Sequence, residues 1–289
     1  MQKKLVYHIY LGEDIETNVA YKVNMECLKT YIHLFDKVTF VIVMNDINDL
    51  ELRKKGLEYV NTAECVKEMD IVFRPNTDIG EAASVRDYVV DFNSDPDSVV
   101  FFCHTKGITQ FRGGDAKCRT ESIFMWILTM YFYNLNFIEE VENYFLGRKV
   151  GIEAFYGALL MHLYEDDNFP KMIPEFHYSG SFYWFNKPYV SNLSREKKHI
   201  EDYVFNNRYD TEFLPGKIFK WNGMGGGRSS HNSVAIKLNK MLGAYYLLNL
   251  EGWDALIEIL GDKEEFYKFK EKIEEKIGFK AEDLIQTTI

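Results

Sequence analysis

The first third of the chain alternates between apolar runs and amphipathic segments. Residues 4–11, 38–44 and 98–103 are nearly continuous apolar runs rich in β-branched and aromatic side chains, as expected for strands covered on both faces. Between them, residues 17–34 and 81–92 repeat apolar side chains at helical spacing. This alternation predicts an α/β, Rossmann-like fold with a mixed, mostly parallel sheet covered by helices.

Weaker patterns predict the remaining elements, which are helices over 48–55, 119–140, 196–207 and 251–276 and strands over 70–74, 148–154 and 177–186. Residues 233–249 fit a strand, a helix or both. No repeat or low-complexity linker divides the chain. We therefore expect one α/β domain over residues 1–232 and a helical C-terminal extension over residues 233–289 packed on it.

Charge and composition narrow the classes of function. The chain carries 34 Lys and Arg residues against 44 Asp and Glu residues, a net charge of −10, which argues against broad electrostatic binding to nucleic acid. Its four cysteines form no C-x-x-C pair, so we expect buried reduced thiols. The N-terminal apolar run is too short and polar for a signal peptide, and no stretch reaches the ~18 apolar residues of a membrane span. We expect a cytoplasmic protein, and peripheral contact with the inner face of the membrane stays open.

Ligands of open α/β sheets bind beyond the carboxyl ends of the strands. The residues that follow the expected strands are therefore the first candidates for a site, and they are residues 10–13, 45–46, 76–80 and 104–107. A phosphorylated small molecule suits an acidic chain if basic side chains gather locally at this edge.

One basic side chain lies after the third strand. Gly80 can relieve the turn there, and Arg86 follows in the first turns of a helix, an arrangement that suits phosphate or carboxylate. The plain structural alternative is that Gly80 starts the helix and Arg86 pairs with Asp87 or Glu81 at the surface. Without other evidence we favour that alternative.

The segment after the strand over 98–103 is the stronger candidate. Lys106 supplies a compact positive charge suited to phosphate, and His104 can donate a hydrogen bond or bind a metal. Gly107 lets a ligand approach the backbone. A solvated strand end is the alternative, and we favour function.

Three later segments have equally good functional and structural interpretations. Alternation over 177–186 places several side chains on one face, which could stack on a sugar ring or pack in the core; they are Tyr178, Gly180, Phe182, Trp184 and Asn186. Asp210 and Glu212 could supply a general base or form a cap and turn. The glycine-rich loop that contains Arg228 could close over a phosphorylated donor or be a surface loop.

Taken in order, these segments resemble bacterial glycosyltransferases of the GT-A type. The resemblance covers roughly residues 4–220 and rests on Asn76-x-x-x-Gly80-x-Ala82-x-x-x-Arg86-Asp87 followed by the strand 99–103. The His-Thr-Lys sequence after that strand is similar to polysaccharide-synthesis transferases that include the rhamnan synthesis proteins. The segment Gly-Ser-Phe-Tyr-Trp-Phe-Asn and the pattern Tyr209-x-x-Glu212-x-x-x-Gly216 are similar to later motifs of that group.

The resemblance implies transfer of a sugar from a nucleotide-sugar donor to a glycan or lipid-linked acceptor in the synthesis of capsular polysaccharide or lipopolysaccharide. It implies a donor site formed by Tyr10, Leu11, Asn45, Asp46, Asn76, Gly80, Arg86, His104, Thr105, Lys106 and Arg228. Tyr183 and Trp184 would flank the acceptor. In an inverting reaction Glu212 or Asp210 would be the base, with Glu153 in reserve.

The sequence departs from the family at the Asp-x-Asp metal motif, which is missing after the strand 98–103. Asp95-Pro-Asp97 has the spacing but precedes that strand, so it belongs to the opposite edge of the sheet. The diphosphate leaving group still needs its growing negative charge neutralised.

Two arrangements could neutralise that charge. Lys106, together with Arg86 or Arg228, could do so without a metal. Alternatively, His104 and His231 could bind Mn²⁺ or Mg²⁺ with an acidic residue brought in by the fold. We lean towards the metal-independent arrangement and keep both open.

Other function classes also stay open. A catalytically silent nucleotide- or carbohydrate-binding protein in a polysaccharide synthesis complex would keep the sheet and lose the metal motif. A nucleotidyltransferase shares the doubly wound sheet, but the missing glycine-rich activation loop near the first strand counts against it. Nothing in the pattern fixes an oligomeric state.

Overall fold

The structure is a computed structural model, and it describes residues 2–63, 68–89, 98–111, 120–146, 155–157, 160–162, 176–178, 181–186, 211, 228–229 and 248–287. The predicted strand 148–154 and helix 196–207 lie wholly outside them, as do residues 233–247 and the boundary that we expect near residue 232.

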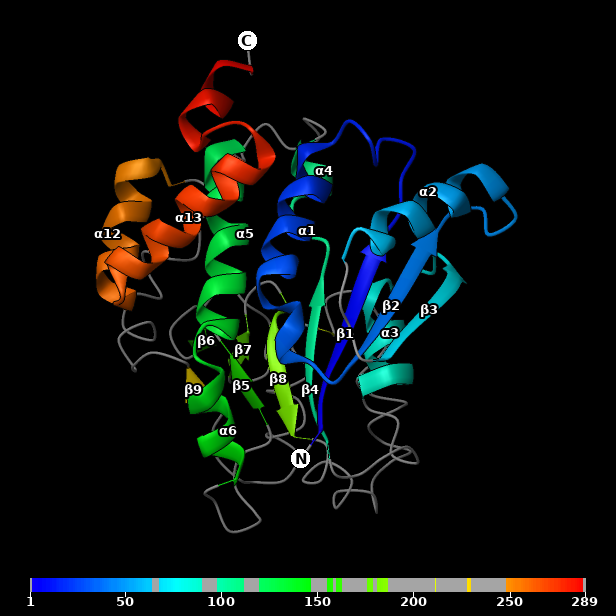
Figure 1. Ribbon diagram of the computed structural model, residues 1–289, viewed down its shortest axis with the longest axis horizontal. Helices are drawn as coiled ribbons and strands as arrows, with labels where there is room; N and C mark the ends of the chain where they lie inside the picture. The colour runs from blue at the N-terminus through cyan, green and yellow to red at the C-terminus, as the bar shows by residue number, and fades with distance from the viewer. Residues whose placement is uncertain are drawn as a thin grey trace.

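The N-terminal half of the sheet is parallel. Its strands are β1 (Gln2–Tyr10), β2 (Lys37–Met44), β3 (Glu68–Pro75) and β4 (Ser98–His104). β2 pairs with β1 on one side and β3 on the other, and β4 pairs with the free side of β1. The chain therefore builds outwards from β1 to β3 and then returns to the opposite side of β1 to form β4 (Figure 1).

Three further strands extend the sheet beyond β4, namely β8 (Tyr183–Asn186), β5 (Phe155–Gly157) and β9 (Arg228–Ser229). β8 runs antiparallel to both β4 and β5, whereas β9 is parallel to β5. The described sheet thus has the order β3-β2-β1-β4-β8-β5-β9, and β6 (Leu160–His162) pairs with β7 (Phe176–Tyr178) in a separate two-stranded sheet. The prediction of a mixed, mostly parallel α/β sheet is confirmed.

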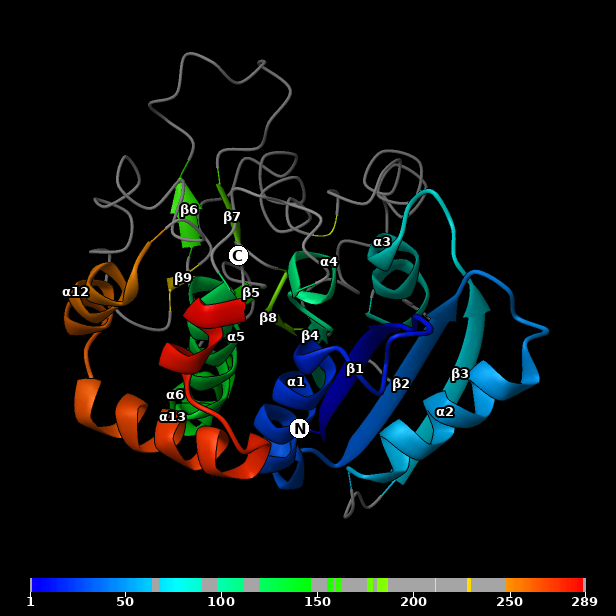
Figure 2. The same cartoon turned by 90° about the horizontal axis from the view of Figure 1, so that it is seen from above.

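Helices cover both faces of this sheet. α1 (Val19–Tyr31) and α2 (Leu50–Asn61) lie on one face, and α3 (Glu81–Ser84) lies on the other (Figure 2). The Asn18 side chain accepts a hydrogen bond from the Ala20 backbone at the start of α1, and the Asp49 side chain does the same for the Leu52 backbone at the start of α2. Both caps satisfy backbone donors that the first helical turn leaves open.

The strands carry apolar side chains into both faces, which explains their nearly unbroken apolar sequences. In β1, the side chains of Leu5, Tyr7 and Ile9 belong to the main hydrophobic core, while Val6 and His8 between them are also buried. Strands of this kind occur where helices cover both sides of a parallel sheet. The sheet therefore stands at the centre of the molecule.

A buried helix links the sheet to the C-terminal region. Every residue of α5 (Thr120–Leu135) after Thr120 is buried, as expected for a helix that is apolar on all sides. The C-terminal helices α12 (Leu250–Leu260) and α13 (Lys263–Ile277) pack against it, as does the 3-10 helix η5 (Ala281–Thr287). The predicted helical C-terminal region is therefore confirmed.

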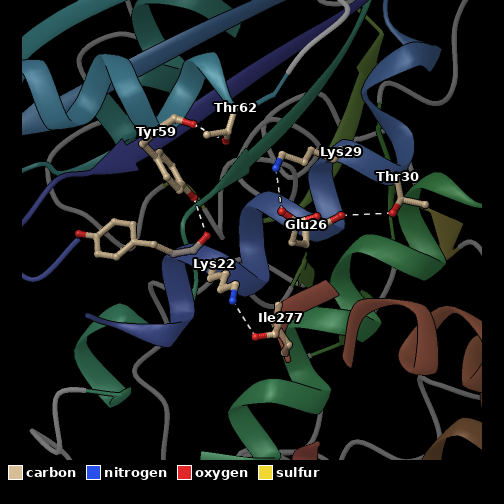
Figure 3. Close-up of polar contacts among 8 residues, drawn as sticks. Lys22, Glu26, Lys29, Thr30, Tyr59, Thr62 and Ile277 are labelled. Carbon is tan, nitrogen blue, oxygen red and sulfur yellow. Dashed lines mark hydrogen bonds and ion pairs between the residues drawn. The ribbon is translucent and has the colours of Figure 1, made fainter. Parts of the chain in front are cut away.

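Polar contacts also hold α1 against its neighbours (Figure 3). The Lys22 ammonium donates to the Ile277 carbonyl of α13 at 2.7 Å. The Tyr59 hydroxyl of α2 donates to the Tyr21 carbonyl of α1 at 2.8 Å. These two contacts hold helix α1 between α2 and α13.

Several predicted boundaries are wrong. The short helix expected over 48–55 continues to Asn61, and Gly56 inside it packs so closely that an added Cβ would lie 2.9 Å from Leu11 Cδ2. The long helix expected over 119–140 is interrupted by a turn between α5 and α6 (Ile138–Leu146). The helix expected over 81–92 is α3 followed by a π-helical turn, η2 (Val85–Val89).

The largest error concerns residues 177–186, which are not one strand. β7 ends at Tyr178 in the small sheet, and β8 begins at Tyr183 in the large one. Ser181 between them has a φ of 57°, a left-handed backbone that interrupts an extended strand. The alternating face that we expected over these residues is therefore not formed.

Two short helical elements complete the described secondary structure, and they are the 3-10 helix η1 (Ile32–Leu34) and the helix α4 (Ile108–Phe111).

Candidate functional site

The strand order defines where a ligand of this sheet would bind. β2 and β3 extend from one side of β1, and β4 lies on the other side, so the order reverses between β1 and β4. In open α/β sheets the binding crevice lies outside the carboxyl ends of the strands at such a switch point. The carboxyl edge of β1 and β4 therefore holds the candidate site.

Thr105 connects the ends of these two strands. Its backbone N–H donates to the His8 carbonyl at 2.9 Å, and its hydroxyl accepts a hydrogen bond from the Tyr10 N–H at 3.2 Å. The side chain is buried. Thr105, which the resemblance places in the donor site, thus holds the two strand ends in register.

Three predicted donor-site side chains form a row along the edge. The amide nitrogen of Asn45, after β2, lies 3.3 Å from the Tyr10 hydroxyl at the end of β1. The amide nitrogen of Asn76, after β3, donates to the Asn45 carbonyl oxygen at 3.1 Å. Both asparagines are exposed and Tyr10 is half-buried, so the row presents amide and hydroxyl groups to a polar ligand.

Two neighbours of this row have other roles. Leu11 is buried in the core, where its side chain lies beneath Gly56 of α2, so its predicted place in the donor pocket is wrong for the side chain. Asp46 is exposed, and its carboxylate accepts from the Asn48 N–H at 2.9 Å within the turn after β2. The carboxylate therefore shapes the turn next to Asn45.

Lys106 is held at the edge by a residue that the sequence did not single out. The Asn24 side chain of α1 accepts from the Lys106 N–H at 3.2 Å and donates to the Lys106 carbonyl at 2.8 Å. The Tyr131 hydroxyl of α5 lies 3.3 Å from the same Asn24 oxygen. Asn24 is fully buried, so two helices fix the backbone of Lys106 from the core side.

The Lys106 side chain lies against α5. Its ammonium is 4.0 Å from the centre of the Trp126 ring, within cation–π range. The chain then turns at Gly107, whose φ is 84° and where an added Cβ would lie 2.6 Å from Ile123 Cγ2. Gly107 therefore permits close packing on α5, and its expected role of admitting a ligand to the backbone stays a prediction.

Two histidines lie side by side on the central strands. His8 in β1 is the register partner of His104 in β4. His8 is buried and its Nδ1 lies 2.8 Å from the Ser84 hydroxyl, and burial lowers the pKa of His8 to about 4. His8 is therefore neutral near pH 7. His104 is half-buried, and its ring lies 5.7 Å from that of Phe182.

The predicted phosphate-binding turn contains an ion pair. Gly80 has a φ of 49°, so the expectation that glycine relieves this turn is confirmed. The Arg86 guanidinium donates to Asp87 at 2.7 Å, and Arg74 pairs with the same carboxylate. Partial burial opposes ionisation of Asp87, but the hydrogen bonds from Arg86 and Arg74 outweigh it and hold its pKa below the ordinary value. Arg86 therefore pairs with Asp87, which is the structural alternative that we favoured from the sequence.

The predicted acceptor residues are core residues. Trp184 is fully buried, donates its indole N–H to the Asn134 carbonyl at 2.8 Å and stacks on Phe35. Tyr183 is also fully buried, and its hydroxyl donates to the Thr211 carbonyl at 3.2 Å. The prediction that Tyr183 and Trp184 face an acceptor is wrong because neither ring reaches the surface.

The remaining candidates fall outside the part of the chain that can be placed. Asp210, Glu212, Glu153 and His231 lie outside the described residues, and only the backbone of Arg228 is described, in β9. Among the residues that are described, no three His, Cys, Asp or Glu side chains gather in a way that could hold a metal ion. We therefore assign no metal ligands and derive no step through a metal.

The sequence contained one usable signal for the residue it missed. Asn24 lies in α1 next to Val23 and between apolar residues that pack in the core, where a polar side chain needs hydrogen-bond partners.

Within the described helices, none is long and apolar enough to cross a membrane. Comparison of the sequence with models of known families and with curated proteins gives no match.

Proposed function

We propose that the protein is a glycosyltransferase that moves a sugar from a nucleotide-sugar donor to a glycan or lipid-linked acceptor. The observation that carries the proposal is the edge between β1 and β4, where Asn24 fixes Lys106 at the topological switch point of a mixed α/β sheet. The resemblance to GT-A polysaccharide-synthesis transferases supplies the reaction class. In this proposal the protein works in the cytoplasm, at the inner face of the membrane where a lipid-linked acceptor would be found.

Different residues at the edge would bind different parts of the donor. The row of Tyr10, Asn45 and Asn76 offers hydrogen bonds to the neutral parts of a nucleotide. The Lys106 ammonium would stabilise the diphosphate as the bond to the sugar breaks and negative charge grows on the leaving oxygen. Asp210 or Glu212 would take the proton from the attacking acceptor hydroxyl in an inverting reaction.

Binding of the donor is the first test. Thermal unfolding would be followed with UDP, GDP, CMP and dTDP sugars, each with and without Mn²⁺. A ligand that binds only the folded state raises its apparent stability, so one nucleotide should raise the melting temperature selectively. Dependence of that rise on Mn²⁺ would support the metal-dependent arrangement. No rise with any donor would count against the proposal.

The second candidate is a nucleotide- or sugar-binding protein without transferase activity. It is favoured by the end of β4, where His104, Thr105 and Lys106 stand in place of the Asp-x-Asp motif of the family. Such a protein would bind a sugar nucleotide without cleaving the bond between the sugar and the diphosphate. Hydrolysis or transfer by the purified protein would eliminate this candidate.

A further inference from the structure

β3 is the last strand on its side of the sheet. It pairs with β2, and in the part of the chain that the structure describes no strand pairs with its other side (Figure 1). Every residue of β3 is at least partly exposed, whereas β2 next to it is buried from Val38 to Met44. The outer side of β3 is therefore an open edge of the sheet.

One hydrogen bond determines which backbone groups of β3 point outwards. The N–H of Asn76, directly after the strand, donates to the Met44 carbonyl of β2 at 2.8 Å. Backbone groups of successive residues point to opposite sides of a strand, so those of Met69, Ile71 and Phe73 point away from β2. The residue that follows in this series is Pro75, which has no N–H. A row of unpaired backbone groups of this kind is a template for a further strand.

The side chains of the same three residues form an apolar strip along the edge. Met69 is 41% exposed, and Ile71 and Phe73 are half-buried. The Arg53 guanidinium of α2 lies 4.6 Å from the centre of the Phe73 ring, so the strip lies on the face that α2 covers. A strand added to this edge would shield the strip from water, which favours association.

The charged side chains of β3 are separated by sign. Glu68 and Asp70 lie at its start, where both contact the Lys37 ammonium, and Arg74 lies at its end, where it pairs with Asp87. A second β3 that runs antiparallel would bring the acidic start of each strand beside the basic end of the other. Opposite charges across a strand pair stabilise it, and like charges destabilise it. The edge is therefore complementary to a second copy of itself.

We propose that two copies of the chain pair through β3 and form a dimer with one continuous sheet. The two strands run antiparallel around a two-fold axis at Ile71. This register sets Ile71 opposite its own copy and Met69 opposite Phe73 of the second copy, so the outward backbone groups of all three residues are paired. It also sets Glu68 opposite Arg74 of the second copy. The inference does not depend on the proposed function, because β2 and β1 separate this edge from β4.

The neighbouring registers fit less well. A shift towards the start of the strand sets Asp70 opposite its own copy, which places two like charges together. A shift towards the end sets Met69 opposite Pro75, which has no N–H to donate. The register centred on Ile71 avoids both faults.

Sedimentation equilibrium of the full chain between about 1 and 100 μM would measure the dimer. The test variant is Met69→Lys, which places a charge in the apolar strip. The matched control is Ile259→Lys in α12, because the side chains of Met69 and Ile259 are both 41% exposed and α12 packs against α5 and α13. The melting temperature of each variant would show whether it is folded.

Cross-linking tests the register itself. A cysteine in Ile71→Cys would lie opposite its own copy, whereas a cysteine in Met69→Cys would lie opposite Phe73. A short thiol-specific cross-linker should therefore join Ile71→Cys into a covalent dimer and leave wild type and Met69→Cys as single chains. If Met69→Lys fails to fold, this comparison carries the test, because a cysteine is a small uncharged change.

Wild type and Ile259→Lys should form dimers of similar affinity, and the dissociation constant of the Met69→Lys dimer should be about tenfold higher or more. A wild type that stays monomeric at every concentration would overturn the inference and leave the edge to a strand of another protein. Equal effects of the two lysine variants would place the interface elsewhere. Cross-linking of Met69→Cys as efficient as that of Ile71→Cys would contradict the register.

Discussion

Asn24 binds the backbone of Lys106 from both sides, accepting from its N–H at 3.2 Å and donating to its carbonyl at 2.8 Å. The two residues are 82 positions apart in the chain, and the contact joins α1 to the segment after β4. This contact fixes the backbone of a positively charged residue at the switch point of the sheet. It also provides a way to disturb the site without changing a residue that would touch the ligand.

We predict that Asn24→Ala weakens anion binding at this edge. Loss of the amide leaves the Lys106 backbone and the Tyr131 hydroxyl without a shared partner, so we expect about a tenfold weaker affinity for inorganic pyrophosphate and a loss of about 2 kcal/mol in the free energy of unfolding. Titration calorimetry and urea unfolding would measure the two effects.

Asn134→Ala is the matched control for that variant. Asn134 is also fully buried in a helix, and each asparagine donates to the carbonyl four residues earlier at 2.7 Å. Asn134→Ala should lower stability to a similar extent and leave pyrophosphate binding unchanged. Equal weakening by both variants would show that the effect of Asn24 is a general loss of stability.

Gly107 and Gly278 form a second matched pair. Both have a φ of 84°, but an added Cβ at Gly278 meets nothing within 4 Å, whereas at Gly107 it would lie 2.6 Å from Ile123 Cγ2. Gly278→Ala should therefore lower the free energy of unfolding by only the backbone strain, about 1–2 kcal/mol. Gly107→Ala should lower it by about 1–3 kcal/mol more, because α5 must move. Equal losses in urea unfolding would contradict the close packing at Gly107.

His8 should make the protein less stable in acid. Burial lowers its pKa to about 4 in the folded state, against an ordinary value of 6.5. Between these two values the unfolded chain binds more protons than the folded one. The stability from neutral His8 is therefore full above about pH 6.5 and is lost as pH falls towards about 4, with a total loss of up to about 3 kcal/mol.

Comparison with His8→Gln isolates this contribution, because the carboxylates that titrate in the same range are shared by both proteins. Urea unfolding at several pH values between 7 and about 4 would give the difference. The difference in the free energy of unfolding between wild type and His8→Gln should shift in favour of the variant as the pH falls. A gap that does not depend on pH would show that His8 titrates normally in the folded protein.

The sequence predicted the position of the carboxyl edge of the sheet better than it predicted which side chains meet there. Tyr10, Asn45 and Asn76 lie together because parallel strands end at one edge, and that geometry follows from the apolar runs before them. Asn24 could not be paired with Lys106, because the two residues are 82 positions apart and the contact depends on how α1 packs. The strand pattern identifies a position at the edge, and only the fold identifies what reaches it.

The aromatic segment shows the opposite case. Alternating aromatic residues describe a core strand as well as a sugar-binding face, so the pattern could not distinguish them. Trp184 is buried beside Phe35, and Tyr183 contacts Thr211. The positive φ of Ser181, which separates the two strands, leaves no mark in the hydrophobic pattern, because that pattern records the polarity of side chains and not the backbone angle.

Turnover of Lys106→Ala tests the central claim most directly. The assay measures release of the nucleoside diphosphate from the sugar nucleotide that binds wild type best, with the melting temperature of the variant measured alongside. Loss of one charged group that stabilises the leaving diphosphate should lower kcat by about 10²–10³. We expect that loss with an unchanged fold, because Asn24 holds the Lys106 backbone, which alanine keeps. The variant also loses the contact of the ammonium with the Trp126 ring, which should lower the free energy of unfolding by about 0.5–2 kcal/mol. Release at the wild-type rate by a folded Lys106→Ala variant would contradict the account.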